Sequence, residues 1–424
     1  MSRRAIENIL LYIFFVVIYC IGLGSIPPKM ELFEEWVNFY LPYLDYPWDR
    51  MMKEFISIRP NDSNQSVNAP IWLLMIKGSR AIFGDGFVGT RLPAVLLSAL
   101  APVLMADWVR RFFRPDLALL AGIAVGAQQH VISFGRTGGY IGPTLTLLIF
   151  IFWLCSIIAL ENKRWPWIPL VVSLVVATFF YSPIRYYELV ALGMIGYQFV
   201  RSRDFRLAHW RPALISLIVL AGVGYALSEG GKKYVALMYI SGRGEQFLLT
   251  DDTLVSREKY EALPERAKMG NVLTTMVPEK LGELKTFYGN GKRFFNYRHQ
   301  HIRNEQFWVP VRPWLLGLFF LGVARCMIAA ISQQRYLVFL AWSVWAWVPL
   351  LVTTGITVNR MFLGVPADVI FLLLGLFVPV DLTAKYVSQK WAMIPKVAAY
   401  AVVLWFSYHS LSTYFSDYIN FPNL

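Results

Sequence analysis

Residues 8–24, NILLYIFFVVIYCIGLG, contain no charged side chain and are long enough to cross a lipid bilayer as one helix. Ten further apolar runs follow along the chain. They are residues 88–109, 115–133, 141–160, 166–181, 186–200, 212–228, 313–331, 335–354, 361–382 and 393–414. Because a spanning segment in lipid must satisfy its own backbone hydrogen bonds, this pattern predicts an all-α polytopic membrane protein with about eleven transmembrane helices.

The composition supports the same class. The 424 residues are 56% hydrophobic and 16% charged, whereas soluble domains carry about 25% charged residues. A net charge of +13 would suggest nucleic acid binding in a soluble protein. Here the basic residues cluster in short loops, where they orient helices, so no nucleic acid partner is predicted. The three cysteines lie far apart, in or beside apolar runs, and form neither a disulfide framework nor a metal-binding spacing.

Lys and Arg in short loops predict the orientation of the chain. The residues that fall on one side are Arg3, Arg4, Arg110, Arg111, Arg114, Lys163, Arg164, Arg201, Arg203, Arg206, Arg211, Arg335, Lys385, Lys390 and Lys396. This side is expected to be cytoplasmic and to include the N-terminus, which we interpret as a retained signal-anchor. The whole chain, 1–424, is then a single membrane domain. Two long outer segments, 25–87 and 229–311, face the periplasm, and residues 69–83 are expected to form a helix at the interface.

The first outer segment contains a cluster of carboxylates among aromatic residues. In KMELFEEWVNFYLPYLDYPW (residues 29–48), Glu31, Glu34 and Glu35 lie close together and Asp45 follows. An amphipathic helix at the interface, with its acidic face in water, explains this pattern without any function. The alternative is that one carboxylate acts as a general base towards a substrate delivered in the membrane. Periodicity does not decide between the two.

Short loops on the outer side keep one arginine each: Arg136, Arg185 and Arg360. A guanidinium suits a phosphate because it is always charged and donates bidentate hydrogen bonds. Snorkelling to the interface, or pairing with an acid such as Glu188, explains each arginine equally well. If several of them converge with acids on one face, a lipid phosphate becomes the favoured ligand.

Several motifs, taken in order, resemble the bacterial membrane glycosyltransferases of the GT-C fold, close to the protein O-mannosyltransferase (glycosyltransferase family 39) and aminoarabinose transferase group. These motifs are LFEEWVNFY, NAPIWLLMIKGSRAIFGDGFVGTRLP, ISFGRTGGYIGP, FFYSPIRYYELV, FNYRHQHIRNEQFWVPVRPWLLGLFFLG and NRMFLGVPADVIFLLLGL. The second ends in the Arg-Leu-Pro element that begins at Arg91, and the fourth holds the Tyr-x-Pro-x-Arg element from Tyr181 to Arg185. The resemblance covers most of the chain, and each motif alone is weak.

The resemblance implies an inverting glycosyltransferase that takes a sugar from a polyprenyl-phosphate carrier at the outer face of the cell membrane. Glu34 stands at the position of the family's general base, with Glu35 beside it. Arg185 and Arg360 are the preferred ligands of the lipid phosphate, followed by Arg136. The further substrate-binding candidates are Arg91, Tyr181 and Glu188. The acceptor, whether lipid, polysaccharide or protein, is left open, and so are protein partners.

The chain departs from the family at two points. Glu34 replaces the more common Asp, and the segment RTGGYIGPTLT lacks the second carboxylate that many relatives carry there. The second departure puts a metal bridging two acids in doubt, and the sequence supports no metal site. It also keeps open a non-catalytic subunit of a membrane complex. A lipid or sugar transporter is a third alternative, although no internal repeat is found.

Overall fold

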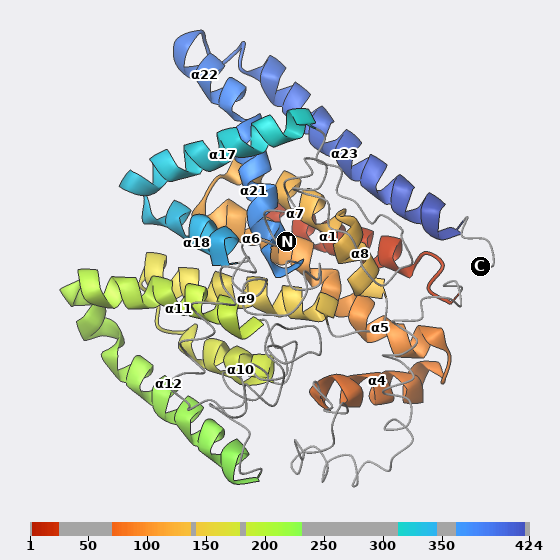
Figure 1. Cartoon of the computed structure of the whole chain (residues 1–424), viewed down its shortest axis with the longest axis vertical. Helices are drawn as coiled ribbons and strands as arrows, with labels where there is room; N and C mark the ends of the chain where they lie inside the picture. Colours follow the sequence, from red (N-terminus) through yellow and green to blue (C-terminus); the bar gives the residue numbers. More distant parts are fainter. Residues whose placement is uncertain are drawn as a thin grey trace, which may run out of the picture.

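The computed structural model describes residues 2–24, 70–136, 141–178, 184–230, 313–345 and 362–419, and every regular element in them is a helix (Figure 1). The α-helices are α1 (Arg3–Cys20), α4 (Pro70–Phe83), α5 (Phe87–Ser98), α6 (Leu100–Phe112), α7 (Ala118–Gly126), α8 (Gln129–Arg136), α9 (Ile141–Glu161), α10 (Trp167–Thr178), α11 (Ile184–Arg201), α12 (Arg203–Gly230), α17 (Pro313–Ser332), α18 (Leu337–Trp345), α21 (Val365–Leu376), α22 (Val378–Tyr386) and α23 (Met393–Ile419). Short 3-10 turns are η1 (Pro115–Leu117), η4 (Gln334–Tyr336) and η5 (Phe362–Gly364). The predicted all-α class is confirmed.

Four of the described helices are long and apolar enough to cross a membrane: Phe87–Phe112, Gly142–Glu161, Arg203–Val223 and Val365–Tyr386. Shorter apolar helices lie at Pro115–Gly126, Trp167–Ala177 and Gly317–Ser332. Several predicted spans continue into residues outside the described ranges, so the count of about eleven stays a prediction. The predicted interfacial segment, residues 69–83, is helical as α4 and packs on α5.

Two predicted spans are broken helices. Residues 88–109 form α5 and α6, which meet at Ala99. Pro102, in the first turn of α6, has no N–H to donate to the carbonyl of Ser98, so the hydrogen-bond ladder is interrupted there. Residues 115–133 form η1, α7 and α8, with the helix ending at Gly126 and restarting at Gln129.

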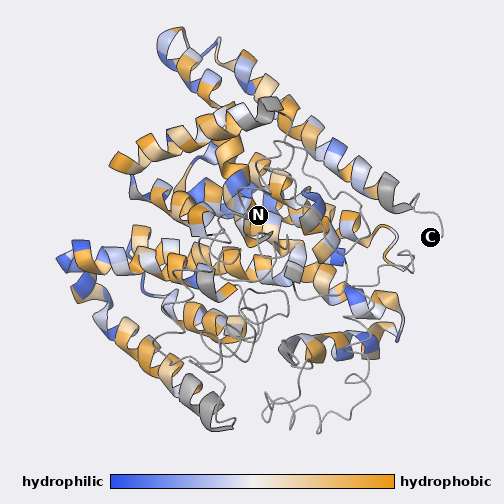
Figure 2. Ribbon diagram, viewed as in Figure 1, coloured by the Kyte–Doolittle hydropathy of each residue, from blue (hydrophilic) through white to orange (hydrophobic). Residues whose placement is uncertain are grey.

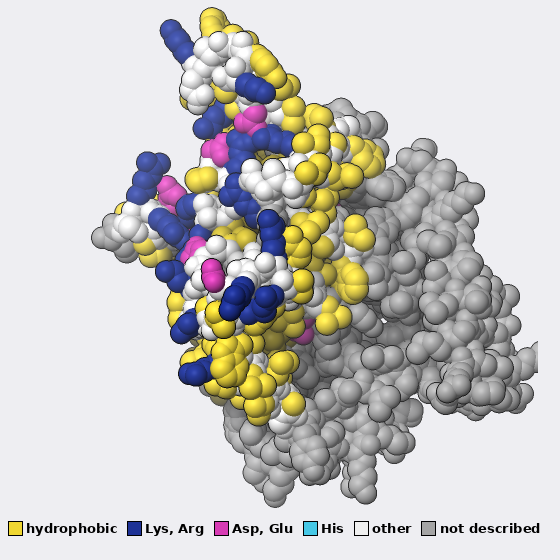
Figure 3. Space-filling view, turned by 90° about the vertical axis from the view of Figure 1, so that its left-hand side faces the viewer, with side chains coloured by type: hydrophobic (Ala, Val, Ile, Leu, Met, Phe, Trp, Pro, Cys, Tyr) yellow, Lys and Arg dark blue, Asp and Glu magenta, His cyan; other side chains and the backbone are white. Residues whose placement is uncertain are grey.

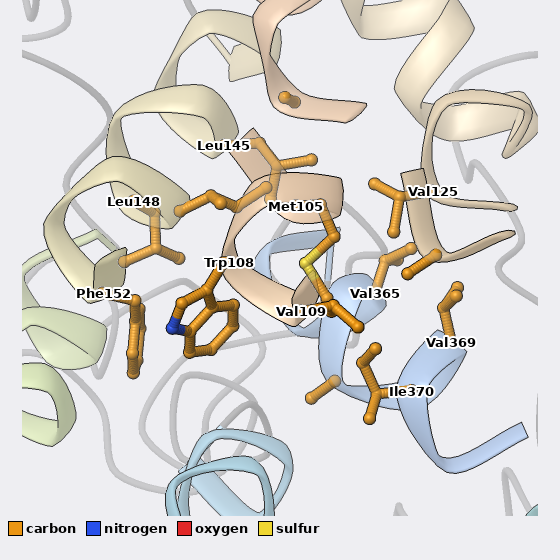
Figure 4. Packing of buried hydrophobic residues seen from close by; sticks show 14 of the residues in the cluster. Met105, Trp108, Val109, Val125, Leu145, Leu148, Phe152, Val365, Val369 and Ile370 are labelled. Carbon is orange, nitrogen blue, oxygen red and sulfur yellow. The ribbon is translucent and has the colours of Figure 1, made fainter. Parts of the chain in front are cut away.

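The apolar core lies where α6, α7, α9 and α21 meet (Figure 4). Trp108 is fully buried beside Phe152, and its indole N–H donates to the hydroxyl of Ser156 at 2.8 Å. Phe152 also stacks on Trp342 of α18, with ring centroids 4.1 Å apart. These large rings join three helices that are remote in sequence, α6, α9 and α18, and the single polar atom of Trp108 has a partner.

Apolar residues also cover helix faces that point away from the core (Figure 2). The clearest case is α12, at the edge of the bundle in Figure 1, where 11% of the membrane-length window is buried, against 67–78% for the other three candidate spans. Leu214, Leu217 and Ile218 of this helix are exposed. Such a face is unfavourable in water and favourable in lipid. The chain is therefore an integral membrane protein.

Charged side chains gather at one end of the bundle (Figure 3). There the first turns of α1 meet the last turns of α6: Arg4 donates to Asp107 at 2.8 Å, and Arg110 donates to Glu7 at 2.9 Å. Arg111 pairs with Glu161, the last residue of α9. Basic residues that the loop pattern assigned to one side thus lie at one end. That this end is cytoplasmic stays a prediction.

Arg114 bonds to carboxylates from separate elements at this end of the bundle. It donates to Asp116 at 2.7 Å and to Asp381 of α22 at 2.6 Å, and Asp381 also pairs with Arg325 of α17. Burial opposes the charge of Arg114, but hydrogen bonds from the guanidinium to the two carboxylates outweigh it and raise the pKa of Arg114. The hydroxyl of Tyr400 in α23 donates to the carbonyl oxygen of Asp116 at 2.7 Å. Helices α6, α17, α22 and α23 are therefore linked through one polar cluster.

Replacing Arg114 by methionine is expected to lower the free energy of unfolding by about 1.5–3 kcal/mol, because two carboxylates lose charge-assisted hydrogen bonds. Thermal or denaturant unfolding in detergent measures this change. Arg3→Met is the control, since Arg3 also pairs with a carboxylate but its side chain is 93% exposed. It should change stability by less than about 0.5 kcal/mol. Equal effects of the two substitutions would contradict a role for the Arg114 cluster.

Candidate functional site

The described residues include half of the predicted site. Glu34, Glu35, Tyr181 and Arg360 lie outside them. The others fall on three helices: Arg91 on α5, Arg136 at the end of α8, and Arg185 and Glu188 on α11. Helix α11 packs on α9, α10, α12 and α18, and α1 packs on α5 and α8.

The first part of the candidate site lies at the C-terminal end of α1. The helix ends at Cys20, and Gly22 then adopts a φ of 64°, in the left-handed region that favours glycine. The last carbonyl groups of a helix have no partner within the helix and carry the negative end of its dipole. Residues 21–24 continue from this end of the helix, and α1 packs against α5 and α8. Hydrogen-bond donors must therefore come from elsewhere in the fold.

Arg136 supplies two of these donors. Its Nε donates to the carbonyl oxygen of Tyr19 at 3.0 Å, and its Nη2 donates to the carbonyl oxygen of Ile21. The residue is 3% exposed. Its guanidinium also lies over two rings of α23, with Cζ 5.6 Å from the centroid of Tyr414 and 5.0 Å from that of Phe415. Contacts to backbone and aromatic faces fix the orientation of this cation.

Arg91 reaches the same turn from α5. Its Nη1 donates to the carbonyl oxygen of Leu23 at 2.8 Å, and its Cζ lies 4.3 Å from the centroid of Phe87. The residue is 7% exposed. Two arginines predicted separately as substrate ligands thus converge on residues 19–23. They do so as donors to the backbone, an outcome that sequence reasoning did not consider.

Small residues allow α8 and α9 to approach α5 closely enough for Arg136 to reach α1. A Cβ on Gly135 would lie 3.0 Å from the side chain of Ser98. A Cβ on Gly142 would lie 2.5 Å from the hydroxyl of Ser98 and 2.7 Å from the carbonyl oxygen of Phe134. Glycine is therefore required for packing at residue 142.

Polar contacts tie α23 to the break between α7 and α8. The hydroxyl of Ser410 donates to the carbonyl oxygen of Ala127 at 2.7 Å, and the side-chain amide of Gln129 donates to the carbonyl oxygen of Ser410 at 3.3 Å. Tyr19 of α1, fully buried, donates from its hydroxyl to the carbonyl oxygen of Gly126 at 2.9 Å. Sequence reasoning missed these residues, because single Ser, Gln and Tyr residues in apolar helices carry no motif.

Two acids on other helices are partly buried. Glu188 lies one turn into α11. Asp368 is in the first turn of α21, where a negative charge complements the helix N-terminus, and it accepts a hydrogen bond from Ser343 at 3.2 Å. These contacts give Asp368 a structural role at the start of α21. Within the part of the chain that the structure describes, no three His, Cys, Asp or Glu residues group closely enough to hold a metal ion.

Comparisons with known proteins identify a matching family profile and a similar solved structure. Residues 67–228 match the sequence profile described as dolichyl-phosphate-mannose-protein mannosyltransferase. Among solved structures, ArnT from Cupriavidus metallidurans, bound to undecaprenyl phosphate, matches with 13% identity and a TM-score of 0.49, over 96% of this chain and 74% of that chain. No curated protein sequence matches. The profile spans α4 to α12 and contains Arg91, Arg136, Arg185 and Glu188. From α4 to α12 the chain thus carries the sequence pattern of the protein mannosyltransferases, a family of membrane glycosyltransferases, which confirms the resemblance that its motifs indicated.

Proposed function

We propose that this protein is an inverting glycosyltransferase of the GT-C fold that moves a sugar from a polyprenyl-phosphate carrier to an acceptor at the outer face of the membrane. The match of residues 67–228 to the mannosyltransferase profile carries this proposal. Membrane-embedded helices suit a donor whose polyprenyl chain is dissolved in the bilayer. The bound undecaprenyl phosphate of the ArnT structure is consistent with a donor of this class.

In the proposed reaction, Glu34 accepts the proton of the acceptor hydroxyl while that oxygen bonds to the anomeric carbon of the sugar. The bond between this carbon and the phosphate oxygen breaks, and polyprenyl phosphate leaves with the bonding electrons. Attack from the opposite face inverts the configuration. Arg185 and Arg360 stabilise the departing phosphate by charge-assisted hydrogen bonds. Glu35, Tyr181 and Glu188 complete the substrate site.

Purified protein in detergent or nanodiscs tests the function. It is incubated separately with polyprenyl-phosphate mannose, glucose and aminoarabinose, together with a membrane and envelope extract as acceptor. Release of polyprenyl phosphate from one donor, with its sugar in the extract, is the expected result. Consumption of none of the donors, together with stable co-purifying proteins, would favour the non-catalytic subunit instead. Movement of the donor across the membrane of sealed proteoliposomes, without release of polyprenyl phosphate, would favour a transporter.

Replacing Arg360 or Arg185 by glutamine is expected to lower kcat by about 10²-fold, because each substitution removes a charged donor from the leaving phosphate. Steady-state kinetics with varied donor measures this loss. Arg203→Gln is the matched control, since Arg203 is exposed at the first residue of α12. An equal loss in all three variants would indicate general damage rather than loss of phosphate binding.

A further inference from the structure

We infer that Arg136, assisted by Arg91, is a positioning residue that holds the exit of α1 and thereby places the carboxylates of the first outer segment. This role differs from the binding of the leaving phosphate that a lone outer arginine suggests. The inference rests on the proposed function, in which Glu34 is the base. It rests structurally on where the two guanidinium groups lie.

Hydrogen bonds from the two arginines hold the C-terminal end of α1. Carbonyl oxygens of Tyr19, Ile21 and Leu23 all accept from these two arginines. They belong to the last turn of α1 and to the residues directly after it, where helical partners run out. The positive φ of Gly22 turns the chain at the same place. Arg136 and Arg91 therefore determine the direction in which the chain leaves the helix.

The charges of the two arginines are compensated by their surroundings. Both arginines are more than nine-tenths buried, and a buried cation needs compensation from nearby negative groups. The negative end of the α1 dipole supplies part of it. The rings of Phe87, Tyr414 and Phe415 supply more, through their π faces. For Arg136, backbone carbonyl groups and ring faces therefore provide partners for the guanidinium without a phosphate.

The end of α1 is connected through the chain to the proposed base, because Leu23 lies eleven residues before Glu34. Under the proposed function, we expect that displacing residues 21–24 also misplaces this base. A misplacement of about 1 Å in a reacting group costs up to about 10²-fold in rate. Loss of Arg136 should therefore lower kcat, whereas the affinity for the lipid phosphate should be retained.

The experiment compares Arg136→Met with Arg206→Met, a control in which an exposed arginine also donates to two backbone carbonyl groups. Arg206 donates to the carbonyl oxygens of Phe199 and Val200 near the end of α11, at 2.7 and 2.9 Å. Three quantities are measured: kcat and donor KM, the Kd for polyprenyl phosphate, and amide hydrogen exchange of residues 19–28. Arg136→Met is expected to lower kcat by about 10- to 100-fold. It should change the Kd by less than about twofold and should speed amide exchange at residues 19–28. Arg206→Met should leave kcat, the Kd and this exchange unchanged.

A tenfold or greater weakening of the Kd, with unchanged exchange, would overturn the inference and return Arg136 to the phosphate site. If Arg136→Met does not fold, Arg136→Lys and Arg91→Met are used. Lys keeps the charge but not the fork that reaches two carbonyls, so it should restore kcat only partly. If the wild-type protein transfers no sugar, the proposed function fails. Exchange at residues 19–28 still decides whether Arg136 holds the end of α1.

Discussion

Glu34→Gln is expected to lower kcat for sugar transfer by about 10²- to 10⁴-fold while donor KM changes little. Glutamine keeps nearly the same size and hydrogen-bonding reach, but its amide does not accept the proton of the acceptor hydroxyl. The loss therefore reports proton transfer rather than packing. The pH dependence gives a second measurement. The wild-type rate should fall as pH decreases through the pKa of the base, whereas the residual rate of the variant should lack this fall.

Two matched substitutions make this test specific. Glu31→Gln changes a neighbouring carboxylate that we interpret as a surface acid, so it should keep wild-type activity. Glu34→Asp keeps the base and shortens it by one methylene, to the residue that relatives more often carry, so it should retain part of the activity. Wild-type activity in Glu34→Gln would remove Glu34 from the mechanism, and Glu35→Gln would then be tested as the base.

The fold was predictable where local pattern decides it. The run of apolar residues at 141–160 predicted the helix observed at Ile141–Glu161 almost to its ends. The segment 69–83 predicted α4 equally well. In lipid a long apolar segment has few alternatives to a helix, so local pattern is enough.

The breaks in α5–α6 and α7–α8 were not predicted, although hydropathy is high across both. In the first, Pro102 gives a local signal that a count of apolar residues ignores. In the second, Gly126 faces the ring of Phe15 so closely that a Cβ would lie 2.3 Å away. That constraint comes from α1, more than a hundred residues earlier, and no local pattern contains it.

In the candidate site, too, local sequence identified a residue, whereas its partners depend on distant parts of the chain. An arginine at an outer helix end was visible as an unusual cation, and phosphate binding, snorkelling and pairing with an acid were the alternatives considered. The observed partners of Arg136 are backbone carbonyls 115 and 117 residues away. Every residue has a carbonyl, so the sequence contains no signal that selects these as acceptors. Arg136 donates to these particular carbonyl groups because α8 packs against α1.

Gly322→Val is expected to disrupt the contact between α17 and α21 and to cost about 3 kcal/mol or more of stability, at the upper end for overpacking. A Cβ at Gly322 would lie 1.7 Å from the carbonyl oxygen of Phe371, and one at Gly375 would lie 1.8 Å from that of Leu318. These neighbours are backbone atoms, so no side-chain rotation relieves the overlap. The two helices must separate, as expected where small residues form a close interface in a membrane.

Separation of α17 from α21 would also loosen contacts further along the pair. Phe319 and Phe371, now 5.6 Å apart between ring centroids, would lose their edge contact, and Arg325 would move away from Asp381. The expected result is a lower Tm in detergent and faster proteolysis at the α17–α18 junction. Gly322→Ala should show a smaller effect of the same sign, because it adds the Cβ alone.

Gly317→Ala is the matched control on the same helix, since no described atom lies within 4 Å of its added Cβ. It should leave Tm unchanged or raise it slightly, because alanine favours a helix more than glycine does. The double variant Gly322→Ala, Gly375→Ala should cost less than the sum of the single variants, because one separation of the helices relieves both overlaps. Additive losses, or an unchanged Tm in Gly322→Val, would mean that α17 and α21 do not pack through these glycines.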